Sequence, residues 1–301
     1  MSRVLAPARF GRRQKPHQQT AFRQEPFLSR SAAMLVMGIF TLYFLIPIWW
    51  LLVASTKDTG DVLTTAPLWF ADFNFFANIG DLAAFRDGVY FRWLGNSVLY
   101  AGLGALVATV FAGMAGYALA KYDFRGRDRI FNVILGGVLV PSTALALPLF
   151  LMFSQVNLTN TFWAVFLPSI ASPFGVYLSR IFAASAVPDE LLEASRLDGS
   201  GEIRTFYTIG WRLMLPGLVT VFLFQFVAIW NNFFLPLIML RSESLFPVTF
   251  GLYAWNTQLN QLPELRSLVL IGALLSIIPL IVMFLSLQRF WRNGVGSGAL
   301  K

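Results

Sequence analysis

The chain has 301 residues, of which 56% are hydrophobic and 13% carry a charge, and its formal net charge is +8. Soluble domains average about 25% charged residues, so this composition excludes a soluble protein and predicts an integral membrane protein. In a membrane protein the positive charge is expected in cytoplasmic loops and does not indicate nucleic-acid binding. The chain has no cysteine and one histidine, His17, which excludes disulfides and thiolate metal sites and almost excludes histidine-based metal or catalytic sites.

The first part of the chain is predicted to be a basic tail followed by a membrane span. Residues 1–31 carry many basic side chains against the single acid Glu25, with no sustained apolar period. They are expected to form a cytoplasmic tail, with contact to anionic lipid as the alternative. Residues 32–56 carry no charge and are long enough to cross a hydrocarbon core of about 30 Å, so they are predicted to form span one.

Small side chains recur along the predicted span two. The loop 57–92 is net acidic, which favours the outer side, and span two follows at 93–120. In lipid, small residues at every fourth position let helix backbones approach closely, so one face of this span is expected to pack on another helix. The ridge consists of Ala108, Ala112, Gly116 and Ala120.

Residues 130–179 form a stretch without charge that is long enough for two spans. Span three is predicted at 130–153 and span four at 161–180, joined on the outside by the polar turn 155–160. The basic loop 121–129 before them is expected inside. Proline removes a backbone donor and clashes with the preceding turn, so both spans are expected to be kinked. The prolines are Pro141, Pro148, Pro168 and Pro173.

A polar segment, 185–212, separates two apolar halves of the chain and is expected on the cytoplasmic side. Pro188 suits the first turn of a short helix, and Gly199 can adopt the positive φ that ends it. Ser200 is expected to cap a second short helix. In the first helix, helical spacing places Leu191, Ala194, Ser195 and Asp198 on one face and Glu193 and Leu197 on another. In the second helix, the same spacing places Ile203, Phe206, Tyr207 and Gly210 on one face. An interfacial loop that merely joins two spans is the alternative.

The remaining elements complete six spans with both termini in the cytoplasm. Span five is predicted at 213–240 and span six at 267–288, with the outer loop 241–266 between them. The sequence therefore predicts an all-α protein whose six-span domain covers 32–301. Apart from Arg180 at the edge of span four, no predicted span contains a charged residue. This argues against proton- or sodium-coupled transport and suits a neutral, hydroxyl-rich solute.

Polar side chains in the spans are the candidates for a solute pathway. The main candidates belong to span five and are Gln225, Asn231 and Asn232. The weaker candidates are Ser142, Thr143, Ser169 and Ser172. For each of them the alternative is a helix–helix hydrogen bond worth about 1 kcal/mol.

The polar segment resembles a known family signature. The sequence Glu193-Ala194-Ser195, then Asp198-Gly199, then Phe206, Ile209 and Pro216 resembles the EAA motif of binding-protein-dependent ABC importer permeases. Other stretches resemble the sugar-transporting, maltose-type branch of that family: Asn96-Ser97, Tyr117 to Lys121, Phe124 to Arg127, Trp230 to Phe234, Pro236, and Gln288 to Phe290. Ser195 replaces the second alanine of the motif, and Arg212 stands where the family often has a proline.

The resemblance implies a non-catalytic permease subunit that forms the translocation pathway for a sugar or a related carbohydrate and has no metal site. It implies that the polar segment is a coupling helix that docks on a cytoplasmic ATPase subunit. The implied docking residues are Glu193, Ala194, Ser195, Asp198 and Gly199. The chain has no Gly-x-x-x-x-Gly-Lys-Ser/Thr phosphate loop, so ATP and Mg would bind to the partner ATPase and no cofactor to this chain.

The implied partners are a homologous second permease subunit in a heterodimer, two cytoplasmic ATPase subunits, an extracytoplasmic solute-binding protein and membrane lipid. The implied location is a bacterial or archaeal cytoplasmic membrane. The outer loop is expected to reach the binding protein through aromatic residues, with an interfacial aromatic belt as the alternative. These residues are Phe246, Phe250, Tyr253 and Trp255. The alternative function is that of a stand-alone secondary transporter of a small polar solute.

Overall fold

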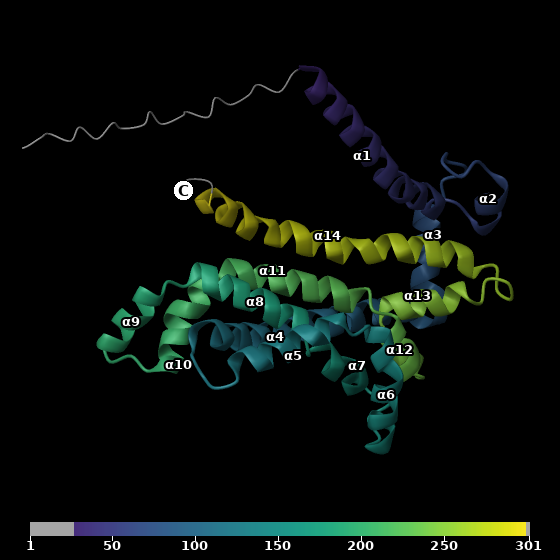
Figure 1. Cartoon of the computed structure of the whole chain (residues 1–301). Coiled ribbons are helices and arrows are strands. Elements are labelled where there is room, and N and C mark those ends of the chain that lie inside the picture. The colour runs from purple at the N-terminus through teal and green to yellow at the C-terminus, as the bar shows by residue number, and fades with distance from the viewer. Residues whose placement is uncertain (1–26, 299–301) are drawn as a thin grey trace, which may run out of the picture. The chain divides into compact units, whose positions relative to one another are not determined.

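The computed structural model describes residues 27–298, and all the regular structure in this range is helical (Figure 1). The chain divides into two compact units, Met1–Ile48 and Trp49–Lys301. Within the described range, five helices are long and apolar enough to cross a membrane, and a bent helix pair brings the number to six if it counts as one span. The predicted all-α class is confirmed, and the six predicted spans agree with the upper number.

The described part of the first unit, residues 27–48, belongs to helix α1 (Phe27–Ser55). Residues 33–48 are exposed and mostly apolar, and the Thr41 hydroxyl donates to the Met37 carbonyl at 2.7 Å. An apolar helix whose polar groups are satisfied internally suits a membrane span, as predicted for span one. The predicted tail, 1–31, lies outside the described residues except for 27–31, which α1 includes.

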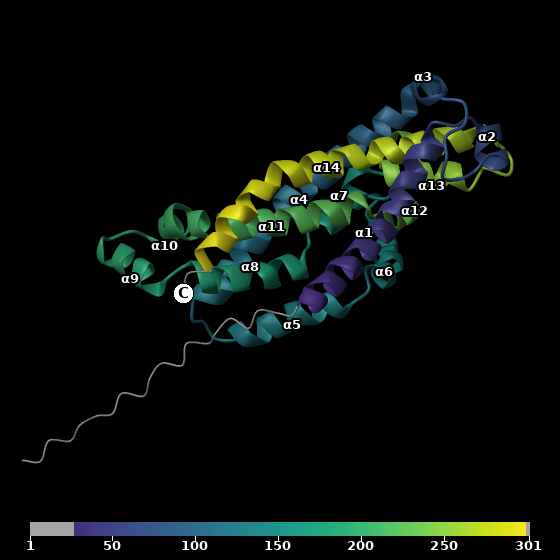
Figure 2. The same ribbon diagram turned by 90° about the horizontal axis from the view of Figure 1, so that it is seen from above.

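The second unit holds the remaining helices. In chain order they are α2 (Thr59–Thr64), α3 (Phe75–Ala84), η1 (Phe85–Gly88), α4 (Val89–Lys121), α5 (Arg127–Leu139), α6 (Ser142–Gln155), α7 (Phe162–Ser169), α8 (Pro173–Ala186), α9 (Asp189–Leu197), α10 (Glu202–Thr205), η2 (Phe206–Gly210), α11 (Trp211–Trp230), α12 (Phe234–Met239), η3 (Glu243–Leu245), α13 (Val248–Asn256) and α14 (Leu265–Gly298). Helices α9 and α10 lie at one end of this unit, and α2, α3 and α13 lie at the other (Figures 1 and 2).

Helix α4 is the centre of the second unit and packs mainly on α8 and α11. The predicted ridge of small residues lies in these contacts, and Ala108 and Ala112 are each 1% exposed. The closest approach is at Gly116, where a Cβ would lie 2.5 Å from the Ser179 Cβ and 2.6 Å from the Arg180 backbone nitrogen. The predicted close contact between two helix backbones is confirmed.

Predicted span three is broken into two helices. Helices α5 and α6 are bent by 101° relative to each other. The break lies at Val140, which is extended, and Pro141, which precedes the first turn of α6. A residue before proline is disfavoured in the helical region, so the predicted kink becomes a full interruption here. Pro148, in contrast, lies inside α6 without ending it.

Predicted span four is also interrupted, between α7 and α8. The Ser172 hydroxyl accepts a hydrogen bond from the Gly175 amide at 2.9 Å, and Pro173 follows in the first turn of α8. A side-chain cap followed by proline is typical of a helix start. The two helices together give an apolar span of 25 residues, 162–186, which ends later than predicted.

The helix of span five begins before the predicted residue 213 and ends before the predicted residue 240. Helices α10, η2 and α11 form one continuous helical path from Glu202 to Trp230. Asn231 and Asn232 follow its end, and the Asn232 side chain accepts a hydrogen bond from the Leu235 amide at 3.2 Å, at the start of α12. The two asparagines thus belong to a helix break rather than to the interior of a straight span.

Asn96 and Ser97, near the start of predicted span two, form hydrogen bonds with the loop before α13 and with the first residue of α13. The Asn96 amide donates to the carbonyls of Ser244 and Phe246 at 2.9 and 3.0 Å. The Ser97 hydroxyl accepts from the Val248 amide at 2.7 Å, in a fully buried contact. Two side chains about two turns inside α4 therefore satisfy backbone groups about 150 residues away.

Replacing Ser97 with alanine is expected to destabilise the fold by about 1–3 kcal/mol, because the buried Val248 amide would lose its acceptor. Thermal unfolding in detergent would show this as a lower midpoint. Ser154→Ala is the matched control, since the exposed Ser154 hydroxyl donates only to the Leu151 carbonyl of its own helix. Equal midpoints for the two variants would contradict the prediction.

Candidate functional site

Helix α9 carries charged residues at one end of the second unit and forms an ion pair there with the end of α4. Pro188 precedes its first residue, and Asp189 and Glu190 stand in the first turn, where the helix dipole favours negative charge. The Asp189 carboxylate accepts from the Lys121 ammonium group at 2.8 Å, and the lysine side chain is only 5% exposed. The start of α9 is therefore anchored to the last residue of α4.

The end of α9 is a glycine turn of the predicted kind. Gly199 has φ +77°, its amide donates to the Arg196 carbonyl at 3.0 Å, and the Ser200 amide donates to the Ser195 carbonyl at 3.0 Å. These two bonds form a Schellman motif, in which a left-handed residue closes the helix. The predicted role of Gly199 in ending the first helix is confirmed.

The second half of the segment differs from the prediction in its start and in its faces. Gly201 rather than Ser200 precedes α10, and no side chain caps it. Phe206 and Gly210 are buried against α4, whereas Ile203 is 76% exposed and Tyr207 52% exposed. The predicted common face is therefore split, and a π-helical turn at η2 interrupts the regular spacing within it.

The buried side of this turn rests on one aromatic ring of α4. The rings of Tyr117 and Phe206 lie 4.9 Å apart, and a Cβ at Gly210 would lie 2.6 Å from the Tyr117 ring. Burial raises the pKa of Tyr122, the residue directly after α4, so this phenol stays neutral beside the carboxylate of Glu202. The buried side of this turn therefore packs on aromatic side chains at the end of α4.

The structure separates the five predicted docking residues into two groups. Glu193, Ala194, Asp198 and Gly199 are exposed. Ser195 is 8% exposed and lies on the inner side of α9 together with Leu192, which is 3% exposed. The predicted face of Leu191, Ala194, Ser195 and Asp198 is thus not the buried one.

Two apolar side chains of the segment are more exposed than expected for a surface in water. Leu197 is 89% exposed and stands four residues after Glu193, and Ile203 is 76% exposed. Sequence reasoning assigned Leu197 to the same face as Glu193 but gave it no role. The available signal was the presence of large apolar residues on the polar side of an amphipathic helix.

The pathway candidates make local or helix–helix contacts. The Gln225 amide of α11 donates to the hydroxyl of Ser172, which lies in the break between α7 and α8. The Asn231 amide donates to the Val227 carbonyl at 2.9 Å, and the Ser169 hydroxyl donates to the Val165 carbonyl at 2.7 Å. Ser142 and Thr143 are exposed at the start of α6. Their assignment to a solute pathway stays a prediction.

The four aromatic residues of the outer loop have different surroundings. Trp255 is 1% exposed and its ring lies 4.6 Å from that of Trp93. Phe250 is 6% exposed and its ring lies 4.2 Å from that of Phe246. Tyr253 is 41% exposed. In this conformation Tyr253 offers the largest free surface of the four, and Trp255 and Phe250 belong to the core.

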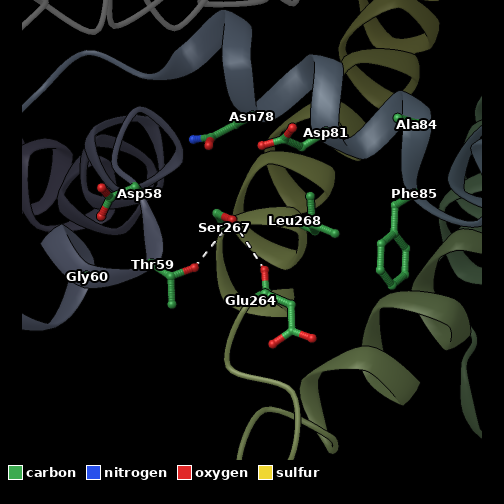
Figure 3. A pocket seen from close by; sticks show the side chains of 10 residues that line it. All are labelled: Asp58, Thr59, Gly60, Asn78, Asp81, Ala84, Phe85, Glu264, Ser267 and Leu268. Carbon is green, nitrogen blue, oxygen red and sulfur yellow. Dashed lines mark hydrogen bonds between the residues drawn. The ribbon is translucent and has the colours of Figure 1, made fainter.

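A cleft of about 700 Å³ opens at the end of the unit opposite α9 (Figure 3). Three carboxylates line it, from Asp58, Asp81 and Glu264. The Thr59 hydroxyl donates to the Ser267 hydroxyl at 3.5 Å across this cleft, and the Ser267 hydroxyl donates to the Glu264 carbonyl at 3.4 Å. Among the described residues, no group of acids or histidines has an arrangement that could hold a metal ion.

A set of long apolar helices with a polar helix–turn–helix segment at one end defines a multi-pass membrane protein. Residues 108–295 match the family model of the binding-protein-dependent transport system inner membrane component. The chain belongs to this family and is therefore a membrane permease component of an ABC importer.

Curated relatives cover most of the chain. The arabinooligosaccharides transport system permease protein AraQ of Bacillus subtilis is 31% identical over 280 residues, which is 90% of this chain and 96% of the relative. The AraQ protein of Halalkalibacterium halodurans is 36% identical over 71% of this chain and 75% of the relative. The lactose transport system permease protein LacG of Rhizobium radiobacter is 30% identical over 86% of this chain and 92% of the relative.

A solved structure shows the same fold. It is a chain from the crystal structure of a bacterial ABC transporter involved in the import of the acidic polysaccharide alginate. The match has a TM-score of 0.76 and 23% sequence identity, and it covers 87% of this chain and 96% of the other.

Proposed function

We propose that this chain forms part of the translocation pathway for a sugar or a related carbohydrate that an external solute-binding protein delivers. The observation that carries the proposal is an exposed EAA-like helix, α9, fastened to the inner helices of a chain of this family. The transport names of the relatives, which refer to arabinooligosaccharides and lactose, support a carbohydrate. The predicted spans, which contain no charged residue apart from Arg180, suit a neutral solute.

The segment 185–212 faces the cytoplasm and docks on one of two ATPase subunits. Its docking surface comprises Glu193, Ala194, Leu197, Asp198 and Gly199, all of which are exposed. Leu197 joins this set because burial against a partner would remove its apolar surface from water. Ser195 leaves it because its side chain already faces inward.

The rest of the complex follows from this orientation. Both termini lie in the cytoplasm of a bacterial or archaeal cell, and the loop 241–266 faces the binding protein, with Tyr253 as its exposed aromatic residue. A second, homologous permease subunit completes the pathway. ATP and Mg bind to the ATPase subunits, since this chain has no phosphate loop. Closure of those subunits moves α9 and shifts the helices between inward and outward access.

The test of this function is uptake by the whole complex in proteoliposomes. Accumulation of a labelled oligosaccharide is expected only when the binding protein is present outside and ATP inside. Ionophores that dissipate proton and sodium gradients should leave the rate unchanged. Uptake without ATP that collapses with the gradient would instead establish the secondary transporter.

Glu193→Lys is expected to reduce ATP-driven uptake by about tenfold or more, because it reverses the charge in the docking surface, and changes at the few dominant residues of an interface cost about 2 kcal/mol or more. Folding should be unaffected, since Glu193 is exposed. Uptake rates in proteoliposomes measure the effect. Asp72→Lys, in the exposed outer loop, makes the same change in net charge and should transport normally. Equal losses in both variants would argue against a specific docking role.

A further inference from the structure

Three hydroxyl groups connect α9 to α10 across the glycine turn. The Ser195 and Thr205 hydroxyl oxygens lie 2.8 Å apart in a buried contact. The Thr205 hydroxyl donates to that of Ser200 at 3.2 Å. We call this chain of Ser195, Thr205 and Ser200 the hydroxyl clasp. When Ser195 donates to Thr205 and Thr205 donates to Ser200, each of these bonds has its own proton.

The clasp spans a turn that is rich in glycine. The turn reads Gly199-Ser200-Gly201, and glycine has the largest conformational freedom of all residues. Neither glycine has an atom within 4 Å of the position that a Cβ would take, so no packing restrains the turn at these positions. The angle between α9 and α10 therefore depends on the backbone hydrogen bonds of the turn and on side-chain contacts across it.

The side chains across the turn are unequal in their protection from water. Thr205 is 1% exposed and Ser195 is 8% exposed, so water competes little for their hydrogen bond. Arg196 and Glu202 form an ion pair at 2.8 Å, but both side chains are more than 40% exposed. Exposed pairs contribute little, so the buried hydroxyls are the stronger connection.

The two ends of α9 connect to the membrane helices in different ways. On the exit side, the helical path runs without interruption from Glu202 to Trp230. On the entry side, Val187 and Pro188 are both extended and separate α9 from α8. Helix α9 is thus joined to α8 by two extended residues and to α10 by the glycine turn, so a displacement of α9 must change the backbone at one of these two links.

We propose that the hydroxyl clasp makes Ser195 and Thr205 positioning residues for transport, holding α9 at a fixed angle to α10 so that α9 and α11 move as one body. This inference rests on the proposed docking of α9 on an ATPase. With the clasp closed, motion of the docked helix is transmitted to α11 and bends the chain at Val187–Pro188. With the clasp open, the glycine turn absorbs part of that motion and ATP is hydrolysed with less transport.

The test compares Thr205→Val, which keeps the shape and removes the hydroxyl, with Thr205→Ser, which keeps the hydroxyl. In the whole complex in proteoliposomes, uptake per ATP hydrolysed is expected to fall about threefold to tenfold for Thr205→Val, the factor that corresponds to one lost hydrogen bond. Thr205→Ser should stay near the wild type. Thr208→Val is the matched control, because the exposed Thr208 hydroxyl donates only to the Arg204 carbonyl of its own helix.

A second readout separates transmission from docking. A cysteine at position 197 should still crosslink to the ATPase in the Thr205→Val background, because the clasp does not form the docking surface. If Thr205→Val fails to accumulate, Ser195→Ala removes the same bond from the other side and should show the same loss.

Wild-type uptake per ATP in both hydroxyl-deletion variants would overturn the clasp proposal alone. An uncoupled loss shared equally by Thr205→Val and Thr205→Ser would overturn it too, since the hydroxyl would then be irrelevant. A wild-type complex that transports without ATP would overturn the proposed function, and the clasp proposal with it.

Discussion

Gly116→Leu is expected to prevent accumulation of folded protein in the membrane. A Cβ at this position would already lie 2.6 Å from the backbone nitrogen of Arg180 and 2.7 Å from the carbonyl carbon of Ser179. A flexible side chain could rotate away, but a helix backbone must move as a whole. Overpacking of this kind costs about 1–3 kcal/mol even for small insertions, and leucine adds a whole side chain between α4 and α8.

The matched control for this variant is Gly102→Leu in the same helix. No atom lies within 4 Å of a Cβ at Gly102, and leucine is a better helix former than glycine by several tenths of a kcal/mol. Accumulation of each variant in membranes, together with its elution profile in detergent, measures the difference. Similar yields of monodisperse protein would show that the α4–α8 contact is not as close as the structure places it.

Leu197→Ala is expected to weaken the binding of the ATPase by about tenfold or more without affecting the fold. Leu197 is 89% exposed, so the free chain loses no packing with the substitution. Full burial of a leucine is worth about 1.5–3 kcal/mol, and tenfold in affinity corresponds to about 1.4 kcal/mol. The loss should appear in the amount of ATPase that copurifies with the permease and in ATP-driven uptake.

Leu63→Ala is the control for exposed apolar surface as such. Leu63 is 63% exposed and lies on α2, at the other end of the second unit. This variant should retain the ATPase and transport normally. A Leu197→Ala complex that binds its ATPase as tightly as the Leu63→Ala complex would remove Leu197 from the docking surface.

Local patterns in the sequence were sufficient for features that depend on neighbouring residues. The left-handed Gly199 follows from the need to end a short helix, and the Schellman bonds around it involve only residues 195–200. The ridge ending in Gly116 and Ala120 follows from the four-residue repeat of small side chains. In these cases the physical cause lies within one or two helical turns of the chain.

Features that depend on distant contacts were not predictable in the same way. Trp255 and Phe250 belong to a segment that reads as an exposed aromatic loop, but Trp93, far away in the sequence, covers Trp255. Pro141 predicted a kink, whereas the 101° bend there also places α6 against α12, a contact between remote segments. Periodicity indicates which face of a helix is apolar, but not which partner covers that face.

The bounds of span five show a further limit. A charge-free stretch predicts where a helix can be buried in lipid, but Glu202 and Arg204 are accommodated at the end of the same helical path. The π-helical turn at Phe206–Gly210 then changes the spacing of the residues that follow it on this path. Simple helical spacing has no means of anticipating the extra residue in such a turn.

The docking of α9 on an ATPase can be measured directly, because the chain contains no cysteine. Leu197→Cys can be compared with Leu63→Cys in the whole complex assembled with excess ATPase, so that weaker binding by the smaller side chain does not limit assembly. The probe is a short bifunctional reagent that reacts with cysteine and then, on illumination, with any neighbour. The cysteine at position 197 should crosslink to the ATPase subunit, with a yield that changes when ATP is added. Crosslinks from position 197 to the external binding protein, or crosslinks to the ATPase from position 63 instead, would contradict the assignment of α9 as the docking helix.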